Sequence, residues 1–270
     1  MKQNFTPGAP HKARKRFGQN FLIDHNIINQ IARSVHPRPD DIVVEIGPGQ
    51  GALTEPLAAS ATTLHVIELD RDLVPWLKVR FEKHPGFSLH QADALKFDFA
   101  ELADDNRPLR IVGNLPYNIS TPLIFHLIGY ADIVQDMHFM LQKEVVKRLA
   151  AEPGTKAYGR LTVMAQYYCN IDWLFDVPPG SFDPAPKVDS AIVRLTPYKT
   201  LPHPARNVGV LEKLVTAAFG QRRKTLRNAL KTFCDPLQLE SMPVDLSKRA
   251  EALTIADFVA LSDAIEPYVL

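Results

Sequence analysis

The sequence has little cysteine and no long apolar run. Cys169 and Cys234 are its two cysteines in 270 residues. They lie far apart and match neither a zinc-ligand spacing nor a disulfide framework, so we expect a protein of the reducing cytosol, without a metal site. No apolar run approaches the roughly 18 residues needed to cross a bilayer, and this absence excludes a transmembrane helix.

The start of the chain, MKQNFTPGAPHKARKRFGQNFL, also lacks the apolar segment of a secretory signal. We therefore expect a cytoplasmic protein that does not bind a membrane. Its length of 270 residues exceeds the usual size of a single hydrophobic core. The length predicts one large domain and one smaller domain.

Acidic residues are nearly absent from two segments, although the formal net charge is only +1. Residues 1–17 contain five basic residues and no acidic one, and residues 194–231 contain nine basic residues and one acidic one. In QRRKTLRNALK, the i, i+4 spacing places Arg223, Arg227 and Lys231 on one side of a predicted helix. A lone run of this kind is typical of a solvated helix face. Two such segments in a near-neutral chain favour a polyanionic partner, because uncompensated positive charges repel each other.

Apolar runs of strand length alternate with helical patterns through the first two thirds of the chain. The runs DIVVEIG, TLHVIEL, FSLHQAD, LRIVGNL and MHFML are separated by segments such as RDLVPWLKVRFEK and TPLIFHLIGYA. This alternation predicts βαβ units and an α/β fold with a mainly parallel sheet. Beyond about Pro197 the pattern is helical only. We therefore predict a sheet domain over residues 1–200 and a small helical domain over residues 201–270.

A glycine-rich loop follows the first of these strands. VVEIGPGQGALTEPL places Gly47, Gly49 and Gly51 between a buried strand and the start of a helix. Glycines allow a tight turn and the close approach of a ligand, and the helix N-terminus offers free N–H groups. The next strand, HVIELD, ends with Glu68, whose carboxylate can accept hydrogen bonds from both hydroxyls of a ribose. This order of strand, glycines and acid predicts a nucleoside cofactor.

The glycine spacing distinguishes between two such cofactors. It is G-x-G-x-G, which differs from the G-x-G-x-x-G of dinucleotide-binding loops. S-adenosylmethionine, which has no pyrophosphate, therefore fits better than NAD. A third strand ends in HQADAL, where we expect Asp93 to bind the adenine amine of the cofactor. The alternative is that these residues are only turn glycines and surface carboxylates.

The stretch GNLPYNIST, residues 113–121, ends a further buried strand. It places an amide, a rigid proline and an aromatic ring within residues 114–117. A turn requires an asparagine or a proline, but it does not require a tyrosine at a fixed offset from the amide. The arrangement indicates a site that holds a flat group close to Asn114 and Tyr117.

Four stretches together point to one family: FGQNFL (17–22), EIGPGQG (45–51), GNLPYNIST (113–121) and FDPAPKVDSAIVRL (182–195). They resemble the ribosomal RNA adenine dimethyltransferase family, most closely its bacterial small-subunit branch, which is associated with kasugamycin sensitivity. The resemblance extends over nearly the whole chain. It implies a Rossmann-like, S-adenosylmethionine-dependent methyltransferase domain followed by a small C-terminal helical domain that binds RNA or the ribosome.

The resemblance also implies the substrate, which is a pair of adjacent adenines near the 3′ end of small-subunit (16S) rRNA. We expect this rRNA to be bound within a pre-assembled small subunit, and the enzyme to be a monomer. The glycine pattern and the resemblance together predict the cofactor-binding residues Asn20, Leu22, Gly47, Gly49, Gly51, Glu68, Asp93 and Asn114. The basic residues expected to bind RNA are Arg222, Arg223, Lys224 and Arg227.

The catalytic residues are expected to be Asn114, Leu115, Tyr117 and Phe182. An exocyclic adenine amine is a poor nucleophile, because its lone pair is delocalised into the ring. Hydrogen bonds from the amine to the Asn114 side chain and the Leu115 carbonyl would localise that pair. Tyr117 and Phe182 would stack on the two faces of a flipped-out base, so the ring of Tyr117 is expected to matter more than its hydroxyl.

Three other functions remain open from the sequence. The first is the sibling activity on large-subunit rRNA that confers macrolide resistance, which the catalytic residues do not distinguish. The second is a ribosome-assembly factor whose main task is binding, and the third is an NAD-dependent dehydrogenase. Three histidines in or beside apolar segments have no carboxylate at a suggestive spacing and are expected to be core or surface residues: His25, His126 and His138.

Overall fold

The computed structural model describes residues 20–104, 107–221, 223–231 and 238–268. The chain divides into two compact units. The N-terminal unit consists of Met1–Lys143 and Asp172–Pro197, and the C-terminal unit consists of Glu144–Ile171 and Tyr198–Leu270. Each unit has its own hydrophobic core.

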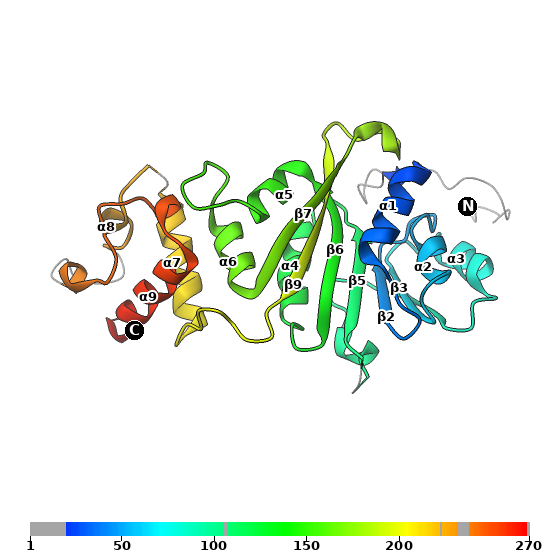
Figure 1. The fold of residues 1–270 in the computed structure, drawn as a ribbon, viewed down its shortest axis with the longest axis horizontal. Helices are drawn as coiled ribbons and strands as arrows, with labels where there is room; N and C mark the ends of the chain where they lie inside the picture. The colour runs from blue at the N-terminus through cyan, green and yellow to red at the C-terminus, as the bar shows by residue number, and fades with distance from the viewer. Residues whose placement is uncertain (1–19, 105–106, 222, 232–237, 269–270) are drawn as a thin grey trace. The chain divides into compact units, whose positions relative to one another are not determined.

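The N-terminal unit is built on a seven-stranded sheet with the order β4-β3-β2-β5-β6-β9-β7 (Figure 1). The described strands are β1 (Phe21–Leu22), β2 (Ile42–Ile46), β3 (Thr63–Glu68), β4 (Phe87–Gln91), β5 (Leu109–Asn114), β6 (Val134–Gln142), β7 (Cys169–Val177), β8 (Phe182–Asp183) and β9 (Ser190–Pro197). Strands β2 to β6 pair in parallel, whereas β9 is antiparallel to β6. The predicted α/β fold with a mainly parallel sheet is therefore confirmed.

The order of the strands creates a switch point between β2 and β5. From β2 the chain continues outward to β3 and β4, and it then returns to the other side of β2 to form β5 and β6. Both β2 and β5 are buried along nearly their whole length, as is typical of central parallel strands. Ligands of open α/β sheets bind at the carboxyl ends of the strands beside such a point. The loop that carries Gly47 begins there, and Asn114 is the last residue of β5.

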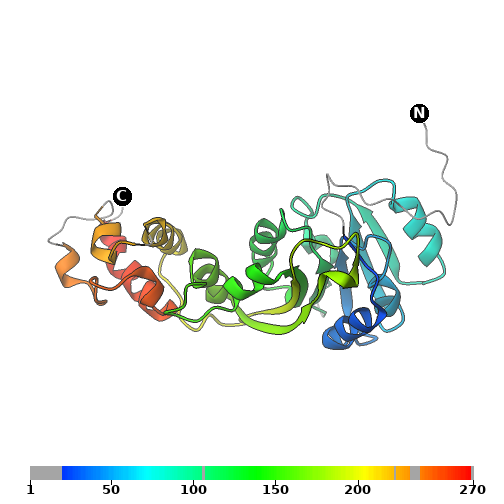
Figure 2. The ribbon, with the colours of Figure 1, turned by 90° about the horizontal axis from the view of Figure 1, so that it is seen from above.

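Helices cover both faces of this sheet, and Figure 2 shows α1 and α4 on opposite sides of it. The described helices of this unit are α1 (His25–Val35), α2 (Thr54–Ala58), α3 (Val74–Phe81) and α4 (Ser120–Ile128). Asp24 caps α1 by accepting hydrogen bonds from first-turn N–H groups, and His36 ends the helix with a left-handed φ of 50°. Ile31 and Val35 of α1 enter the core that lies against β2 and β5.

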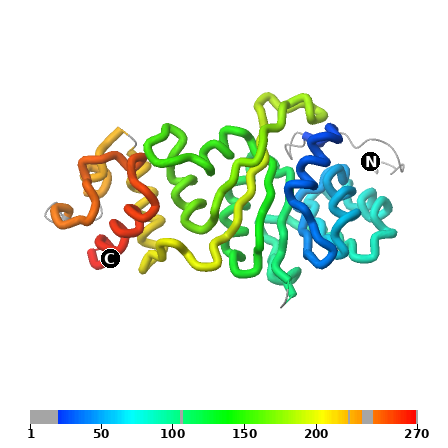
Figure 3. Tube along the Cα trace, viewed as in Figure 1, coloured from blue at the N-terminus to red at the C-terminus, as the bar shows by residue number. Residues whose placement is uncertain are grey.

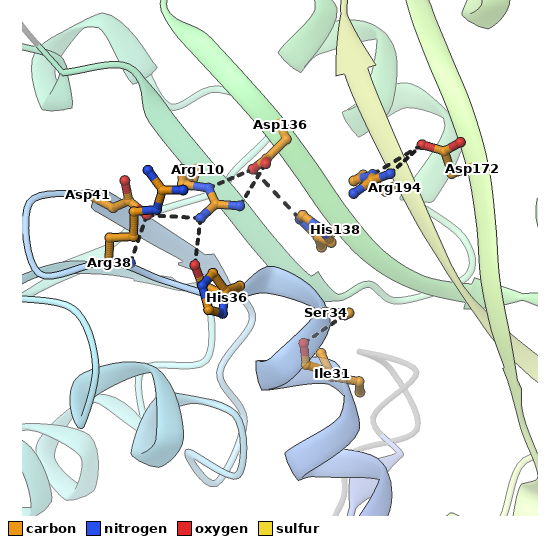
Figure 4. Close-up of polar contacts among 10 residues, drawn as sticks. All are labelled: Ile31, Ser34, His36, Arg38, Asp41, Arg110, Asp136, His138, Asp172 and Arg194. Carbon is orange, nitrogen blue, oxygen red and sulfur yellow. Dashed lines mark hydrogen bonds and ion pairs between the residues drawn. The ribbon is translucent and has the colours of Figure 1, made fainter.

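A charged cluster lies at the amino end of the sheet (Figure 4). The Arg110 guanidinium donates to Asp136 Oδ2 at 2.7 Å, to Asp41 Oδ2 at 2.9 Å and to the His36 carbonyl at 3.1 Å. Nearby, His138 Nδ1 is 3.7 Å from Asp136 Oδ1, too far for a hydrogen bond. Burial lowers the pKa of His138 to about 4, so this ring is neutral at neutral pH. We call these five residues the Arg110 cluster.

The C-terminal unit is helical, but its first part is a segment from the middle of the chain. Its helices are α5 (Lys143–Leu149), α6 (Arg160–Tyr168), α7 (Val208–Gly220), α8 (Leu226–Ala229) and α9 (Ile255–Ile265), of which α5 begins one residue before the unit. Figure 3 shows α6, in green, beside the yellow and red helices. Tyr158 and Tyr167 of this segment are buried in one core with Leu211 of α7 and Phe258 of α9. The inclusion of Glu144–Ile171 was not expected from a division at residue 200.

The prediction of a continuous basic helix through Arg223, Arg227 and Lys231 is wrong. Helix α7 ends at Gly220, and α8 covers only Leu226–Ala229. The backbone provides the reason. The N–H groups of Leu226 and Arg227 bond to the carbonyls of Lys248 and Leu246, at 2.9 and 3.0 Å, so they are not available to continue a helix from α7.

Candidate active site

A cavity of about 300 Å³ opens at the carboxyl ends of the parallel strands. Its wall is formed by the segments that follow β2, β3, β4 and β5, and by the short strand β1. The predicted residues that line it are Asn20, Leu22, Gly47, Gly49, Glu68, Asp93, Asn114, Leu115 and Tyr117. Stretches that lie far apart in the sequence therefore meet at one site.

The glycine loop has the backbone conformation that its sequence predicts. Gly47 and Gly49 have φ values of 68° and 57°, which residues other than glycine rarely adopt. A Cβ atom on Gly49 would lie 3.0 Å from the Phe21 ring, so the glycine also allows β1 to close over the loop. Gly51 differs, because a Cβ there would meet Phe81 at 3.0 Å. Gly51 does not line the cavity; it allows the loop to pack on α3.

Two predicted acids end their strands at the cavity. Glu68 is almost fully buried, and its Oε1 accepts a 2.7 Å hydrogen bond from the Asp70 N–H. Burial raises the pKa of Glu68 to about 7, and the nearby Asp70 carboxylate adds to the rise. Asp93 follows β4, and its Oδ1 accepts from the Leu95 N–H at 3.0 Å. The carboxyl groups of Glu68 and Asp93 are thus fixed at two neighbouring strand ends.

A third acid, Glu45, lines the same cavity and was not predicted. It is 1% exposed, and its Oε2 has no hydrogen-bonding partner among the described residues. Burial raises its pKa to about 8, so the group is largely protonated at neutral pH. The signal in the sequence was a charged residue within the otherwise apolar strand IVVEI. A buried, incompletely bonded polar atom beside a cavity is typical of a ligand site.

The amide of Asn114 has a defined orientation in this wall. Its Nδ2 donates to the Asn20 backbone carbonyl at 3.1 Å. Because the N–H side of the amide is used in this way, Oδ1 is the atom that remains as an acceptor. The next residue, Leu115, is fixed by a 3.2 Å hydrogen bond from its N–H to the Met140 carbonyl on β6. Asn114 is therefore held by the residue that precedes β1, and Leu115 is held by β6.

Tyr117 is half-buried at the cavity and is held at both ends. Its backbone carbonyl accepts from Ser120 Oγ at 3.2 Å, and its phenol oxygen lies 3.0 Å from Ser190 Oγ on β9. The bond between Tyr117 and Ser190 joins the GNLPYNIST stretch to the end of FDPAPKVDS. Sequence reasoning placed both stretches at the site but gave no role to Ser190.

Phe182 is the predicted catalytic residue that the structure does not bring into the cavity. It is 4% exposed and belongs to the core beneath α1. It lies on β8, where it pairs with Leu22 of β1. In this position it supports the strand that covers the glycine loop.

Other candidates lie away from the cavity. His25 is exposed, His126 Nε2 is bonded to the Phe97 carbonyl at 3.0 Å, and His138 is buried in the Arg110 cluster. None of these three histidines lines the cavity, in agreement with the expectation that they are core or surface residues. Within the described ranges, no group of His, Cys, Asp and Glu residues is arranged to hold a metal ion. Nor does any helix in those ranges have the length and apolarity that crossing a membrane requires.

The predicted RNA-binding residues belong to the C-terminal unit. Arg223, Lys224 and Arg227 are exposed, while Leu226 and Leu230 beside them are buried. Arg222 lies outside the described residues, as do the basic residues of the segment 1–17 and Cys234. The described part of QRRKTLRNALK therefore presents cations outward over an apolar underside.

Comparison with known proteins identifies the family. The model of the family described as ribosomal RNA adenine dimethylase matches residues 10–266. The chain belongs to this family. One relative, "Ribosomal RNA small subunit methyltransferase A" of Saccharophagus degradans, is 58% identical over 98% of this chain and 99% of its own length. The protein of the same name from Pseudomonas aeruginosa is 58% identical over 94% of this chain and 95% of its own.

Two solved structures resemble most of the chain. A dimethyladenosine transferase from Plasmodium falciparum has a TM-score of 0.73 at 28% identity, and covers 89% of this chain and 95% of its own. The 23S rRNA methyltransferase ErmE has a TM-score of 0.70 at 26% identity, and covers 92% of this chain and all of its own. The Rossmann-like methyltransferase fold is thus confirmed by comparison.

Proposed function

We propose that the cavity holds S-adenosylmethionine beside a target adenine, and that Asn114 orients the amine that is methylated. The enzyme is an S-adenosylmethionine-dependent rRNA adenine dimethyltransferase, as its family membership establishes. The observation that carries the proposed mechanism is the bond from Asn114 Nδ2 to the Asn20 carbonyl. It leaves Oδ1 as a fixed acceptor in a cavity that also contains the glycine loop and Glu68.

The residues of the cavity fit the cofactor. A Cβ on Gly47 would lie 3.8 Å from the Asn114 carbonyl oxygen, an ordinary contact distance, so the loop leaves room for close approach of a ligand. Glu68 and Asp93 would accept hydrogen bonds from the ribose hydroxyls and the adenine amine, respectively. Asn20 and Leu22 would cover the bound molecule from β1. When bound, S-adenosylmethionine supplies an electrophilic methyl group on a sulfonium.

The protein makes the target amine more nucleophilic by accepting hydrogen bonds from its N–H groups. Hydrogen bonds from its two N–H groups to Asn114 Oδ1 and to the Leu115 carbonyl would favour a pyramidal nitrogen with a localised lone pair. Pro116 stiffens the turn and has no N–H that could compete for these acceptors. The amine becomes acidic after methyl transfer, so its proton can leave to water without a dedicated general base.

Tyr117 is proposed to stack on the flipped-out base. The second stacking partner expected from the sequence was Phe182. Because that ring is buried in the core beneath α1, a stacking role would require the Phe182 side chain to move when RNA binds. The proposal therefore rests on Tyr117 for binding the base, and it gives Phe182 the supporting role of holding Leu22 over the cofactor.

RNA or ribosome binding is proposed for residues 201–270, which form part of the C-terminal unit, and methyl transfer is proposed for residues 1–200. Arg223, Lys224 and Arg227 are exposed cations that a phosphate backbone would neutralise, and Arg222 adjoins them in sequence. Each lost phosphate contact should reduce the slope of log affinity against log salt by roughly 0.7–0.9. An Arg223→Ala/Arg227→Ala double variant with the parental slope would show that these residues form only a solvated face.

The substrate is small-subunit rRNA. Two relatives with this name are 58% and 56% identical over nearly the whole chain, whereas the large-subunit enzyme ErmE is 26% identical. The alternative of a macrolide-resistance activity is therefore not favoured. We propose further that the target is a pair of adjacent adenines near the 3′ end, that the protein acts as a monomer in the cytoplasm, and that it requires a pre-assembled small subunit.

The experiment that tests this function is transfer of tritiated methyl groups from labelled cofactor. The acceptors are naked 16S rRNA, small subunits that lack the modification, and large subunits. We expect label on the small subunits, recovered as N6,N6-dimethyladenosine after nuclease digestion. Equal labelling of naked rRNA would refute the requirement for an assembled subunit. Labelling of large subunits alone would refute the proposed target.

A further inference from the structure

We infer that Ser190 is a positioning residue for methyl transfer, because its hydroxyl fixes the direction in which the Tyr117 ring extends toward the target base. This inference rests on the proposed stacking role of Tyr117. Ser190 itself does not line the cavity. It acts through the 3.0 Å hydrogen bond between its Oγ and the phenol oxygen.

The backbone around Ser190 is well fixed. Ser190 is fully buried at the start of β9, where it pairs with Gln142 of β6. The preceding carbonyl, that of Asp189, accepts from the Lys143 N–H at 2.9 Å. Its hydroxyl is therefore a fixed point on the sheet, whereas Tyr117 belongs to the loop between β5 and α4. The bond ties a loop side chain to a rigid element.

The geometry of tyrosine defines what this bond does. The phenol oxygen lies on the axis about which the ring rotates, so a bond to it does not restrict that rotation. It restricts χ1 instead, and thereby the direction in which the ring extends from the backbone. The backbone of Tyr117 is held separately by Ser120 Oγ. With both ends held, the ring is ready to receive a base before RNA arrives.

This arrangement changes the expectation for the hydroxyl of Tyr117. Stacking alone predicts that the ring is sufficient and that Tyr117→Phe leaves the rate of methyl transfer nearly unchanged. If the hydroxyl orients the ring, Tyr117→Phe and Ser190→Ala remove the same interaction from opposite sides. Each should then slow methyl transfer by roughly two- to tenfold, the factor that the net free energy of one hydrogen bond represents.

The test is a double-mutant cycle under single-turnover conditions with saturating S-adenosylmethionine. We expect Tyr117→Phe, Ser190→Ala and the double variant to show the same reduced rate. Multiplying defects in the double variant would overturn the inference, as would parental rates in the single variants. Ser34→Ala is the matched control, since it removes a hydroxyl that donates to the Ile31 carbonyl within α1, at 2.8 Å.

A second readout does not depend on the reaction. RNA carrying 2-aminopurine at the target position loses fluorescence when the base stacks on an aromatic ring. We expect weaker quenching in Tyr117→Phe and Ser190→Ala than in the parent or in Ser34→Ala. Unchanged quenching in both variants would contradict the positioning role. If Ser190→Ala does not fold, Tyr117→Phe, which keeps Ser190, tests the same bond.

Tyr117→Ala distinguishes a failure of the role inferred for Ser190 from a failure of the stacking role proposed for Tyr117. If Tyr117→Ala is defective in rate and in quenching while Ser190→Ala and Tyr117→Phe match the parent, stacking stands and the role of Ser190 is refuted. If Tyr117→Ala itself matches the parent, the stacking role fails, and with it the reason for positioning the ring.

Discussion

The two ends of the central sheet bury charged groups in opposite ways. At the amino end, the Arg110 guanidinium is bonded to two carboxylates and a backbone carbonyl. At the carboxyl end, Glu45 has a buried oxygen without a partner among the described residues, and Glu68 has a pKa raised to about 7. Charges that satisfy one another hold the fold together. Polar groups left incompletely bonded around a cavity are available to a ligand.

The largest expected effect comes from breaking the amino-end network. Arg110→Met keeps a long side chain but leaves Asp41 and Asp136 buried without their cation. Removing one partner of a buried ion pair typically costs about 3–5 kcal/mol. We expect a loss of this size in the free energy of unfolding, measured by urea denaturation. A loss below about 1 kcal/mol would contradict the view that this end serves stability.

At the carboxyl end, the next effect should be on rate. Asn114→Ala removes the fixed acceptor and should reduce single-turnover methylation by roughly 10²–10³, the scale for one preorganised polar group. Saturating cofactor is needed, because Asn114 also borders the cofactor cavity. Asn29→Ala, an exposed asparagine on α1, is the control. A parental rate in Asn114→Ala would disprove the proposed mechanism.

A smaller effect is expected on cofactor affinity. Glu68→Ala should weaken S-adenosylmethionine binding by about 1.5–3 kcal/mol, measured by calorimetry, because it removes charge-assisted hydrogen bonds to the ribose. In the parent, affinity should also rise between pH 6 and 8. The ribose hydroxyls of the cofactor bond best to an ionised Glu68, whose pKa is about 7. The positive charge of the cofactor also favours ionisation of Glu45, whose pKa is about 8.

Glu68→Gln is the matched variant for this comparison, since it keeps the shape of the side chain and removes its titration. We expect its affinity to depend less steeply on pH than that of the parent, with the remaining dependence due to Glu45. Identical pH profiles for the two proteins would mean that Glu68 does not contact the ribose.

The smallest effect concerns His138 in the Arg110 cluster. Its pKa is lowered from 6.5 in the unfolded chain to about 4 in the fold. The unfolded chain therefore takes up the proton first, and stability that is present above pH 6.5 is lost as the pH falls toward 4. Between pH 6.5 and 5.5 the loss should be about 1 kcal/mol. His138→Gln should lack this loss when the two proteins are compared by denaturation at both pH values.

Local patterns predicted the features that depend on residues close in sequence. The glycines after IVVEI, the acid that ends HVIELD and the amide that ends LRIVGN each follow a parallel strand, and parallel strands bring their carboxyl ends together. The cavity therefore followed from the order of the strands. Its cofactor followed from the glycine spacing, in which Gly51 turned out to face Phe81 instead of the cavity.

Features that depend on contacts between residues far apart in the sequence were not predictable from these local patterns. The break between α7 and α8 arises because Leu226 and Arg227 bond to the segment 246–248. The burial of Phe182 arises from the pairing of β8 with β1. The role of Ser190 requires knowing that β9 lies beside β6, where its hydroxyl reaches Tyr117. No local periodicity contains this information.

The pairing of β1 with β8 also orders events during synthesis of the protein. Phe21 pairs with Asp183, and the N–H of Ile23 bonds to the Ser181 carbonyl at 2.9 Å. Because a ribosome makes the chain from its N-terminus, the strand that covers the glycine loop has no partner until residues 181–183 have emerged. The glycine loop, Glu68 and Asn114 are all made before that point. Translation must therefore pass Asp183 before the cofactor cavity is closed.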